Sequence, residues 1–284
     1  MKTTSSMFLL AAAAALAASG VCAQSRSAPV TTPRIYIFDN GAITGLNPGL
    51  FNFRPDELAE VDFVNTSYLI VHPQGTLMFE AGAVADSHFP ADGGEVTEGV
   101  MSATKPLKPQ LDAAGYAPSD ITYFALSHYH SDHTANANDF AEAIWIVQRA
   151  ERDFMFADDP EGIVQPASYD ALRDAETKIL DNEDLDVFGD GTVVVLAAPG
   201  HTPGHQVVAV ELANAGTVVL GGDLYHYPEE RTTGRVPTFE FDAEQSRASR
   251  RKIEQYLQDN DATLWIEHDI ATHAALPKAP AYVD

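Results

Sequence analysis

Three scarcities limit what this chain can be. Its 284 residues include one cysteine, Cys22, and 17 lysine and arginine residues against 41 acidic ones, for a formal net charge of −24. A nucleic acid partner would need a basic footprint, so the charge argues against one, and it also disfavours anionic membrane surfaces. No G-x-G-x-x-G follows a strand-like run and opens a helix, and no G-x-x-x-x-G-K-[ST] is present. Nucleotide binding by those two devices is therefore unsupported.

The N-terminus carries the features of an export signal. Lys2 is followed by an apolar run over Met7–Ala18, and then by Val21-Cys22-Ala23 before Gln24. Such a segment, cleaved after Ala23, is too short to be read as a spanning helix. We expect residues 1–23 to be a signal peptide and the protein to be periplasmic or secreted, without a membrane span. A lipoprotein with a lipidated Cys22 is the alternative, although Val21 stands where a small residue is expected.

Cleavage after Ala23 would leave a mature protein without a thiol. Disulfides, cysteine nucleophiles and cysteine metal ligands are then excluded together, and any metal must be held by histidine and carboxylate side chains. Residues 24–33 have the composition of a flexible arm. Residues 34–284 show no low-complexity tract, repeat or long linker, so we expect a single domain there.

Strand-like and helix-like segments alternate along this domain. Early strands come in pairs and later ones are separated by helical patterns, which predicts an α+β or α/β fold of mixed sheets flanked by helices. Helices are expected at Pro106–Ala114, at part of Asp139–Ala143, and at Ala150–Phe156, Tyr169–Leu180 and Glu244–Gln258. Strands are expected at Ile35–Phe38, Ser67–Val71, Thr76–Phe79, Ile121–Leu126, Ala143–Val147, Thr192–Ala197, Gln206–Val210, Val218–Leu220 and Leu264–Ile266.

One short stretch, "SHYHSDH", places three histidines and an aspartate close together in the sequence. The chain has ten histidines, and three of them, His128, His130 and His133, stand here with Asp132 directly after a strand-like run. Neutral imidazole and carboxylate are the usual ligands of zinc-like ions. Residues two apart in an extended segment point to the same side, so His128 and His130 can face one ion while Asp132 and His133 reach a second point. Four ligands are too few for two ions.

Three later strand-like runs each end in a residue of the missing kind. They deliver His201 in "PGHTPGH", Asp223 in "GGDLYHY" and His268 in "WIEHDIA". In this order, H-x-H-x-D-H, G-H-T-P-G-H, G-G-D and a strand-end histidine resemble the metallo-β-lactamase superfamily of metallohydrolases. That resemblance implies a four-layer αββα sandwich with His128, His130 and His201 on a first metal, Asp132, His133 and His268 on a second, and Asp223 as the bridge. His205 is expected to support its loop and not to ligate.

Within that superfamily, the resemblance is greatest to the N-acyl homoserine lactonases. Members acting on β-lactams generally lack the bridging carboxylate that Asp223 supplies. Glyoxalase II members carry a helical substrate domain after the last histidine, whereas 16 residues follow His268. Oxygen-reducing members replace the second histidine of the block by a carboxylate, and His130 is retained. The tail "WIEHDIATHAALPKAPAYVD" and the segments "FDNGAI" and "SHYHSDHTANANDF" look like those of the lactonases.

This subfamily commonly places a tyrosine three residues after the bridging aspartate, near the substrate carbonyl. His226 occupies that position here, between Tyr225 and Tyr227. Either an adjacent tyrosine takes over, or His226 supplies the hydrogen bond, or the substrate differs. A purely structural role of "LYHYP" is an equal alternative. Asp132, His226 and Tyr225 are thus the catalytic candidates.

The function expected from these residues is metal-dependent hydrolysis. Two divalent ions, Zn²⁺ or else Co²⁺, Mn²⁺ or Fe²⁺, can acidify a bound water and polarise a substrate carbonyl. We expect the resulting hydroxide to open the lactone ring of N-acyl homoserine lactones or related lactones. An aryl ester, a phosphotriester or a β-lactam is the alternative substrate, and a non-catalytic metal-binding protein is a third hypothesis. The oligomeric state stays open, with a homodimer as one option.

Overall fold

The computed structural model describes residues 30–160 and 162–284. The expected signal peptide, residues 1–23, lies outside the described residues, as does most of the expected arm. Residues 30–33 contain no helix or strand, and Val30 packs against the core beneath them. Within the described ranges, no helix has the length and apolar character needed to cross a bilayer.

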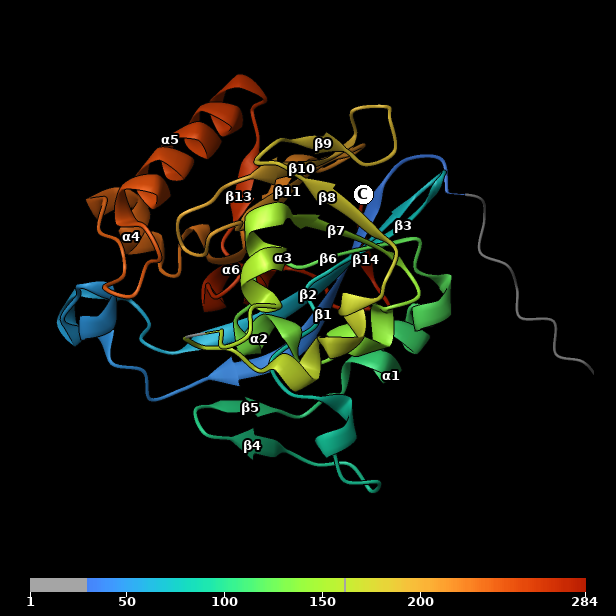
Figure 1. The fold of residues 1–284 in the computed structure, drawn as a ribbon, viewed down its shortest axis with the longest axis horizontal. Coiled ribbons are helices and arrows are strands. Elements are labelled where there is room, and N and C mark those ends of the chain that lie inside the picture. The colour runs from blue at the N-terminus through green and yellow to red at the C-terminus, as the bar shows by residue number, and fades with distance from the viewer. Residues whose placement is uncertain (1–29, 161) are drawn as a thin grey trace, which may run out of the picture.

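Two mixed β-sheets form the centre of the molecule (Figure 1). The larger sheet has the strand order β4-β5-β1-β2-β3-β6-β7-β8, with β14 added beside β1, and its β3-β6-β7-β8 half is parallel. The smaller sheet, β13-β12-β11-β10-β9, is antiparallel except for the parallel pair β12 and β13. The larger sheet comprises β1 Arg34–Ile43, β2 Phe63–His72, β3 Gly75–Phe79, β4 Val96–Glu98, β5 Met101–Ala103, β6 Tyr123–Ala125, β7 Ile144–Gln148, β8 Thr177–Leu180 and β14 Tyr282–Val283; the smaller comprises β9 Leu185–Asp186, β10 Val193–Ala197, β11 Gln206–Leu212, β12 Gly216–Leu220 and β13 Thr263–Trp265.

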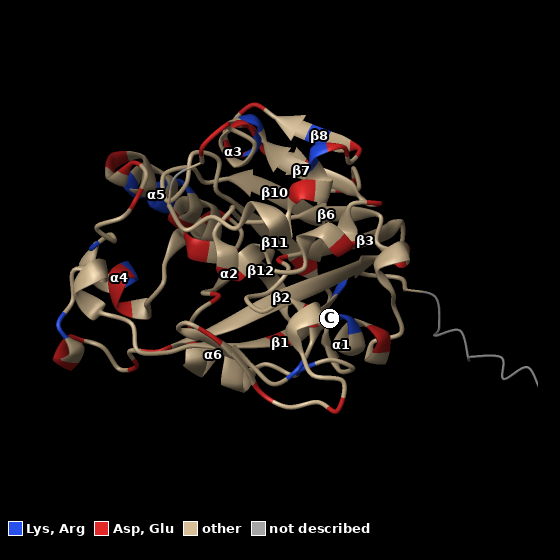
Figure 2. Ribbon diagram, turned by 60° about the horizontal axis from the view of Figure 1, so that its bottom comes forward, with Lys and Arg blue, Asp and Glu red and all other residues tan. Residues whose placement is uncertain are grey.

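Helices cover the outer faces of both sheets. Those of the described chain are α1 Leu107–Ala113, α2 Ser131–Thr134, α3 Arg149–Met155, α4 Pro228–Thr233, α5 Ala243–Asp259 and α6 Ile270–Ala275. Figure 2 shows α3 beside β7 and β8 of the larger sheet, with acidic positions, coloured red, scattered along the ribbon. The α5 helix packs against the smaller sheet through Ile253 and Leu257. The α5 helix begins after Asp242, whose carboxylate accepts hydrogen bonds from the next two free backbone amides, those of Glu244 and Gln245. This is the usual N-cap chemistry.

The alternation of side chains along the strands builds the four layers. In β1, Ile35 and Ile37 point into the core between the sheets, whereas Tyr36 and Phe38 point to the outer face, which α1 covers. Because successive side chains of a strand leave on opposite faces, one apolar strand feeds two cores. The core between the sheets also takes Val195 of β10, and a third core lies between the smaller sheet and α5. The αββα sandwich implied by the resemblance is confirmed.

Several expected elements differ in the structure. The helix expected over Tyr169–Leu180 is wrong: the segment contains a short 3-10 turn, Asp170–Arg173, followed by edge strand β8, whose Thr177 and Ile179 are β-branched and favour a strand. At Asp139–Ala143 there is only a 3-10 turn, Ala137–Phe140. The sequence also gave no sign of β4, β5, β9, β14, α2, α4 and α6, because elements of two to six residues are too short to show a period.

Candidate metal centre

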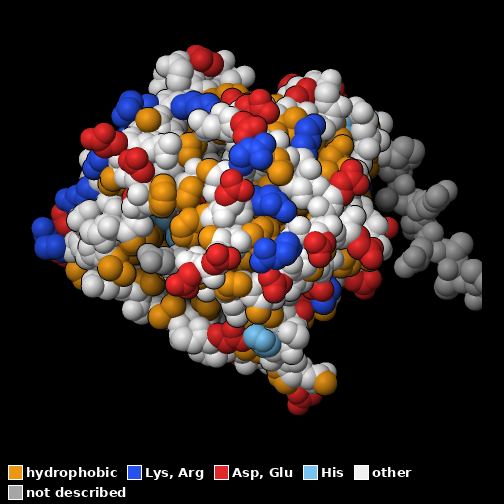
Figure 3. Space-filling view, in the orientation of Figure 1, with side chains coloured by type: hydrophobic (Ala, Val, Ile, Leu, Met, Phe, Trp, Pro, Cys, Tyr) orange, Lys and Arg blue, Asp and Glu red, His pale blue; other side chains and the backbone are white. Residues whose placement is uncertain are grey.

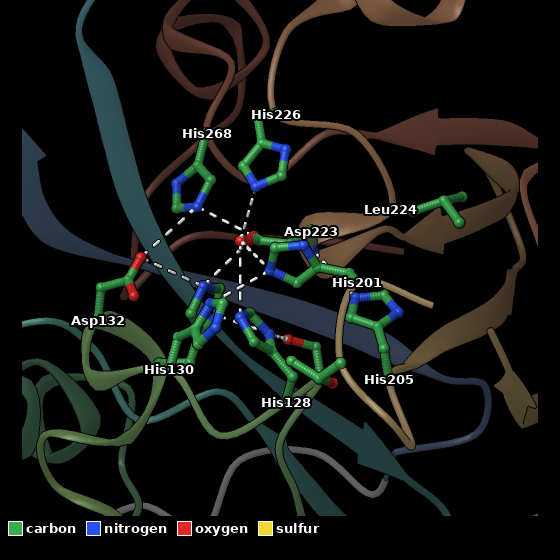
Figure 4. A network of polar contacts seen from close by, with 12 residues as sticks. His128, His130, Asp132, His201, His205, Asp223, Leu224, His226 and His268 are labelled. Carbon is green, nitrogen blue, oxygen red and sulfur yellow. Dashed lines mark hydrogen bonds and ion pairs between the residues drawn. The ribbon is translucent and has the colours of Figure 1, made fainter. Parts of the chain in front are cut away.

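The seven predicted metal-binding residues come from strand ends of both sheets and meet at one edge of the sandwich (Figure 4). His128 and His130 follow β6 of the larger sheet, and α2 begins directly after them and carries Asp132 and His133. His201 follows β10, Asp223 lies in the turn Gly222–Leu224 after β12, and His268 follows β13, all in the smaller sheet. The two sheets thus supply complementary halves of one site.

The first group of ligand atoms belongs to His128, His130, His201 and Asp223, which lie within 4.8 Å of one another. His201 Nε2 is 3.2 Å from His130 Nδ1, and Asp223 Oδ2 is 3.3 Å from His201 Nε2 and 3.6 Å from His128 Nε2. His130 therefore faces this group with Nδ1, whereas His128 and His201 face it with Nε2. An ion about 2.0–2.1 Å from each ligand atom would place such atoms about 3.4 Å apart in a tetrahedron, so the spacing fits a zinc-sized ion.

The second group contains Asp132, His133 and His268. Asp132 Oδ2 lies 3.3 Å from His133 Nε2 and 3.7 Å from His268 Nε2. Asp223 reaches this group with its other oxygen, because Oδ1 is 3.3 Å from His133 Nε2 and 3.0 Å from His268 Nε2. One carboxylate thus faces both groups, as a bridging ligand must.

Three polar atoms at the centre of the site lack a hydrogen bond among the described residues. His128 Nε2, His133 Nε2 and Asp223 Oδ1 are buried, and in the described chain they make no hydrogen bond. Buried polar groups are normally hydrogen-bonded or coordinate a metal. Imidazoles and carboxylates suit zinc, cobalt, manganese and iron alike. The donor set therefore fits two divalent ions and does not select between these metals.

The outward nitrogens of the histidines are held from behind. His128 Nδ1 lies 2.8 Å from Ser127 Oγ, and His268 Nδ1 lies 2.9 Å from the Val64 carbonyl oxygen. A carboxylate holds the outward nitrogen of His201, because Glu240 Oε1 lies 3.5 Å from His201 Nδ1. Partners of this kind fix the tautomer and the orientation of a metal-binding ring.

His133 is the most heavily supported of these rings. Its Nδ1 lies 3.2 Å from Glu80 and 3.4 Å from Glu267, and both glutamates are buried. Sequence reasoning missed Glu80, Glu240 and Glu267. Only Glu267 left a signal, because it directly precedes His268, whereas the other two are brought to the site by strand β3 and by the loop before α5.

The charges of the site are strongly coupled. Burial raises the pKa of the Asp223 carboxyl, but the surrounding imidazoles, His268 and His133 first, outweigh burial and hold that pKa well below its ordinary value. Burial and the neighbouring His133 and His130 rings lower the pKa of His128 well below the usual range. A neutral imidazole beside an ionised carboxylate is the protonation state that metal binding requires.

Backbone geometry at the bridge depends on a glycine. Gly222 has φ +46°, and a Cβ there would lie 2.4 Å from Ser127 Cβ. Only glycine lets the turn carrying Asp223 approach the His128 loop this closely. His205 supports the same turn, because its Nε2 accepts a hydrogen bond from the Asp223 amide at 3.1 Å while its Nδ1 lies 3.1 Å from the Ala198 carbonyl oxygen. Its expected role in supporting the loop agrees with these contacts.

Glu151 of α3 joins the two loops that carry the first group. Its Oε1 accepts a hydrogen bond from the Tyr129 amide, and its Oε2 accepts hydrogen bonds from Thr202 Oγ1 and the Gly204 amide, all at 2.8 Å. Burial raises the pKa of Glu151 to about 7, against the hydrogen bonds that favour its ionised form. This residue was not among the sequence candidates.

His226 lies over the centre of the site. Its Nε2 is 3.1 Å from Asp223 Oδ2, and its Nδ1 is 3.4 Å from Glu230 Oε1. Burial lowers the pKa of His226, but the two carboxylates outweigh it and raise the pKa to about 10. Glu230 is itself fully buried and is paired with Arg250 at 2.6 Å. His226 is thus held as a hydrogen-bond donor three residues after Asp223.

Tyr225 points away from this site, which corrects its candidacy as a catalytic residue. Its hydroxyl donates a hydrogen bond to Glu254 at 3.1 Å, and its ring lies under the Arg250 guanidinium at 4.4 Å. Because the chain is extended at Tyr225 (φ −141°, ψ 141°), neighbouring side chains leave on opposite sides, so His226 and Tyr225 cannot both face the centre.

A pocket of about 310 Å³ opens above the ligand groups. His130, Asp132, Asp223, His226 and His268 form its polar floor. Its wall is almost wholly apolar, and Figure 3 shows apolar side chains gathered on this face of the molecule. The wall residues are Ile43, Leu46, Leu50, Phe51, Phe63, Val100, Met101, Ile163 and Phe239. A concave apolar site with a few convergent polar groups is the usual form of a small-molecule site.

Known proteins are similar to this chain in sequence and in fold. The family model of the metallo-beta-lactamase superfamily matches residues 61–264. An N-acyl homoserine lactonase, AttM, of Rhizobium radiobacter is 30% identical over 224 residues, covering 76% of this chain and 85% of that protein. A solved N-acyl homoserine lactone hydrolase, with the product N-hexanoyl-L-homoserine at its catalytic metal centre, superposes with a TM-score of 0.74 at 24% identity over 89% of this chain and 100% of the other. The dizinc quorum-quenching lactonase AidC gives a TM-score of 0.60 at 21% identity, covering 88% and 93%.

Proposed function

This chain belongs to the metallo-beta-lactamase superfamily and is a dinuclear metal-dependent hydrolase of the lactonase type, and from that premise we propose that it opens the lactone ring of N-acyl homoserine lactones. The observation that carries the proposal is the position of Asp223, whose two oxygens face the two ligand groups at the bottom of an apolar pocket. A site of this kind brings two ions and a substrate carbonyl to one point.

When bound, two divalent ions supply an acidified water at neutral pH and a Lewis acid for the carbonyl oxygen. The chain's own residues do the rest. Asp132 lies at the pocket floor, with Oδ2 3.7 Å from His268 Nε2 and 14% of its side chain exposed, and from there it orients the attacking water. His226, protonated on Nε2, donates a hydrogen bond toward the substrate carbonyl. Oxygen of the water bonds to the lactone carbonyl carbon and the ring C–O bond breaks; one proton of the water ends on the ring oxygen as a hydroxyl, and the other is released as the carboxylate forms.

The apolar wall supports an acyl substrate. Phe51, Phe63 and Phe239 pack around His226 and continue toward the rim at Leu50, Val100 and Ile163. An acyl chain laid along this wall would leave water, and burying each methylene contributes about 0.8 kcal/mol. Acyl homoserine products are bound in the active sites of two structural neighbours. Lactones carrying an aliphatic chain are therefore the substrates that fit.

We further propose that the protein is exported to the periplasm or secreted, on the strength of the N-terminal segment, and that the ions are zinc. Diffusible lactones would meet an exported enzyme before entering the cell. Cleavage after Ala23 is tested by N-terminal sequencing of the protein recovered from the periplasm and medium, and an uncleaved cytoplasmic product would contradict export. Elemental analysis of the purified protein identifies the metal.

A substrate panel with metal analysis tests the central proposal. N-acyl homoserine lactones of several chain lengths, a nitrophenyl ester and a cephalosporin are compared by proton release or absorbance on protein containing two metal ions per chain. The lactones should give kcat/KM at least tenfold above the other substrates. Fully metal-loaded protein that hydrolyses none of the lactones, or prefers the ester or the cephalosporin, would overturn the assignment.

The role of His226 is tested by two neighbouring substitutions. His226→Phe should lower kcat while leaving two metals per chain, because His226 is absent from both ligand groups. Tyr225→Phe, which removes only the hydroxyl bonded to Glu254, should leave kcat close to that of the wild type. The opposite result would return the role to Tyr225.

A further inference from the structure

A second pocket lies on the far side of His226, between α4 and the exposed face of α5. It has a volume of about 530 Å³, within the range of small-molecule sites. Four arginines line it: Arg231 from α4, and Arg247, Arg250 and Arg251 from α5. Positions 247, 250/251, 254/255 and 258 of α5 recur at helical spacing, so one face of this helix forms the wall. Figure 1 shows α4 and α5 side by side there.

The pocket is positively charged in a strongly acidic protein. Six of the 17 basic residues of the chain fall between positions 231 and 252. Two of the four pocket arginines are neutralised, since Arg231 binds Glu254 through two contacts of 2.6 and 2.8 Å and Arg250 binds Glu230 at 2.6 Å. In Figure 3, lysine and arginine side chains gather along the left margin, where Figure 1 places α4.

The other two arginines are uncompensated. Arg247 donates a hydrogen bond only to the Ala243 carbonyl oxygen of its own helix, and Arg251 has no ion pair or side-chain hydrogen bond among the described residues. Gln255 and Gln258 add neutral amide donors to the same wall. The pocket therefore contains two positive charges in excess of its carboxylates, Glu230 and Glu254.

Two free guanidinium groups select a particular kind of ligand. Arginine binds phosphate bidentately and strongly because its planar donors match the phosphate oxygens. A phosphate monoester carries about −1.5 to −2 charges at pH 7, which equals the excess charge of the pocket. The volume exceeds that of a bare phosphate, so an organic body has room beside the phosphate group. The acidity of the remaining surface disfavours a long polyanion such as RNA.

We propose that this arginine pocket, defined by Arg231, Arg247, Arg250 and Arg251, binds a small phosphorylated molecule. The pocket adjoins the metal centre, because Arg250 pairs with Glu230 and Glu230 faces His226. A phosphate there contacts the wall that positions His226 without entering the substrate pocket. Inorganic phosphate is the probe, since it carries the recognised group alone.

The experiment measures phosphate binding calorimetrically to the metal-loaded enzyme at low ionic strength. Because phosphate is also an oxygen ligand for divalent ions, the wild type is compared with the double variant Arg247→Gln/Arg251→Gln, whose metal centre is intact. The wild type should bind one phosphate per chain more than the double variant, or bind it at least about tenfold more tightly. Lactone hydrolysis without phosphate should be equal in the two proteins.

The matched control is Arg54→Gln/Arg149→Gln, which removes two exposed arginines elsewhere on the surface. This variant changes the net charge equally and should bind phosphate as the wild type does. Equal binding by the wild type and the pocket variant would overturn the proposal, and so would an equal loss in the control. Succinate bound as tightly as phosphate would overturn the phosphate assignment. None of these results depends on lactone hydrolysis, so the proposed function is judged separately.

Discussion

Replacing Glu151 should loosen the first metal group although this residue touches neither the metal nor the substrate. Its carboxylate is 3% exposed and accepts three hydrogen bonds of 2.8 Å, one from the loop holding His128 and His130 and two from the loop holding His201. Glu151→Gln keeps the shape of the side chain but turns an NH₂ group toward one of these buried donors. At least one donor then lacks an acceptor.

The expected size of the effect follows from those contacts. An unsatisfied buried donor costs about 1–3 kcal/mol. Glu151→Gln should therefore lower the free energy of unfolding by about that amount. Glu151→Ala should lower it by more, because it leaves all three donors without an acceptor. The cost of burying the ionised carboxylate, visible in its raised pKa of about 7, disappears in both variants and offsets part of the loss. Misplaced loops should weaken metal binding about 10- to 100-fold, as loss of other partners of metal ligands does.

Two measurements test this reasoning. Denaturant unfolding of the zinc-loaded proteins gives the stability change, and competition with a chromophoric chelator gives the zinc affinity. Asp153→Asn, an exposed substitution on the same helix, is the control and should match the wild type in both. A Glu151→Gln protein with wild-type zinc affinity would show that the two loops do not need this carboxylate.

Three further outcomes are expected. Asp132→Ala should reduce lactone hydrolysis at least about 100-fold while far-ultraviolet circular dichroism stays unchanged, because Asp132 lies on the pocket floor and outside every apolar core; unchanged rates would refute its role. Met101→Trp should shift the preference toward shorter acyl chains by filling the 310 Å³ pocket, seen as a rise in KM for a decanoyl lactone relative to a butanoyl lactone. Burial and Lys278 lower the pKa of His273 to about 4 in the folded protein, against about 6.5 in the unfolded chain. The unfolded chain therefore binds this proton more readily, and the free energy of unfolding should decrease as the pH falls from about 6.5 to 4. His273→Gln should flatten that part of the stability curve, measured as Tm against pH.

The sequence by itself determined which chemistry the site can hold. The order and spacing of His128, His130, Asp132 and His133, with one cysteine confined to the N-terminus, restrict a metal to imidazole and carboxylate ligands. Apolar and β-branched runs such as Ile35–Phe38 predicted strands, and the amphipathic run Glu244–Gln258 predicted α5 to within a residue at each end. These signals are local, because they depend on neighbours a few residues apart.

Only the tertiary structure decided which atoms of those residues face each ligand group and which side chains face the pocket. Asp223 gives one oxygen to each ligand group, and His130 turns Nδ1 toward the first group. Tyr225 faces Arg250, whereas His226 faces the pocket. These directions depend on where the strand ends of the two sheets meet. The carboxylates behind the rings, Glu80 and Glu240, come from segments far from the histidines in sequence. Spacing along a chain fixes the kinds of ligand, but packing between sheets fixes their directions, because a side chain's contacts across a core leave no period in the sequence.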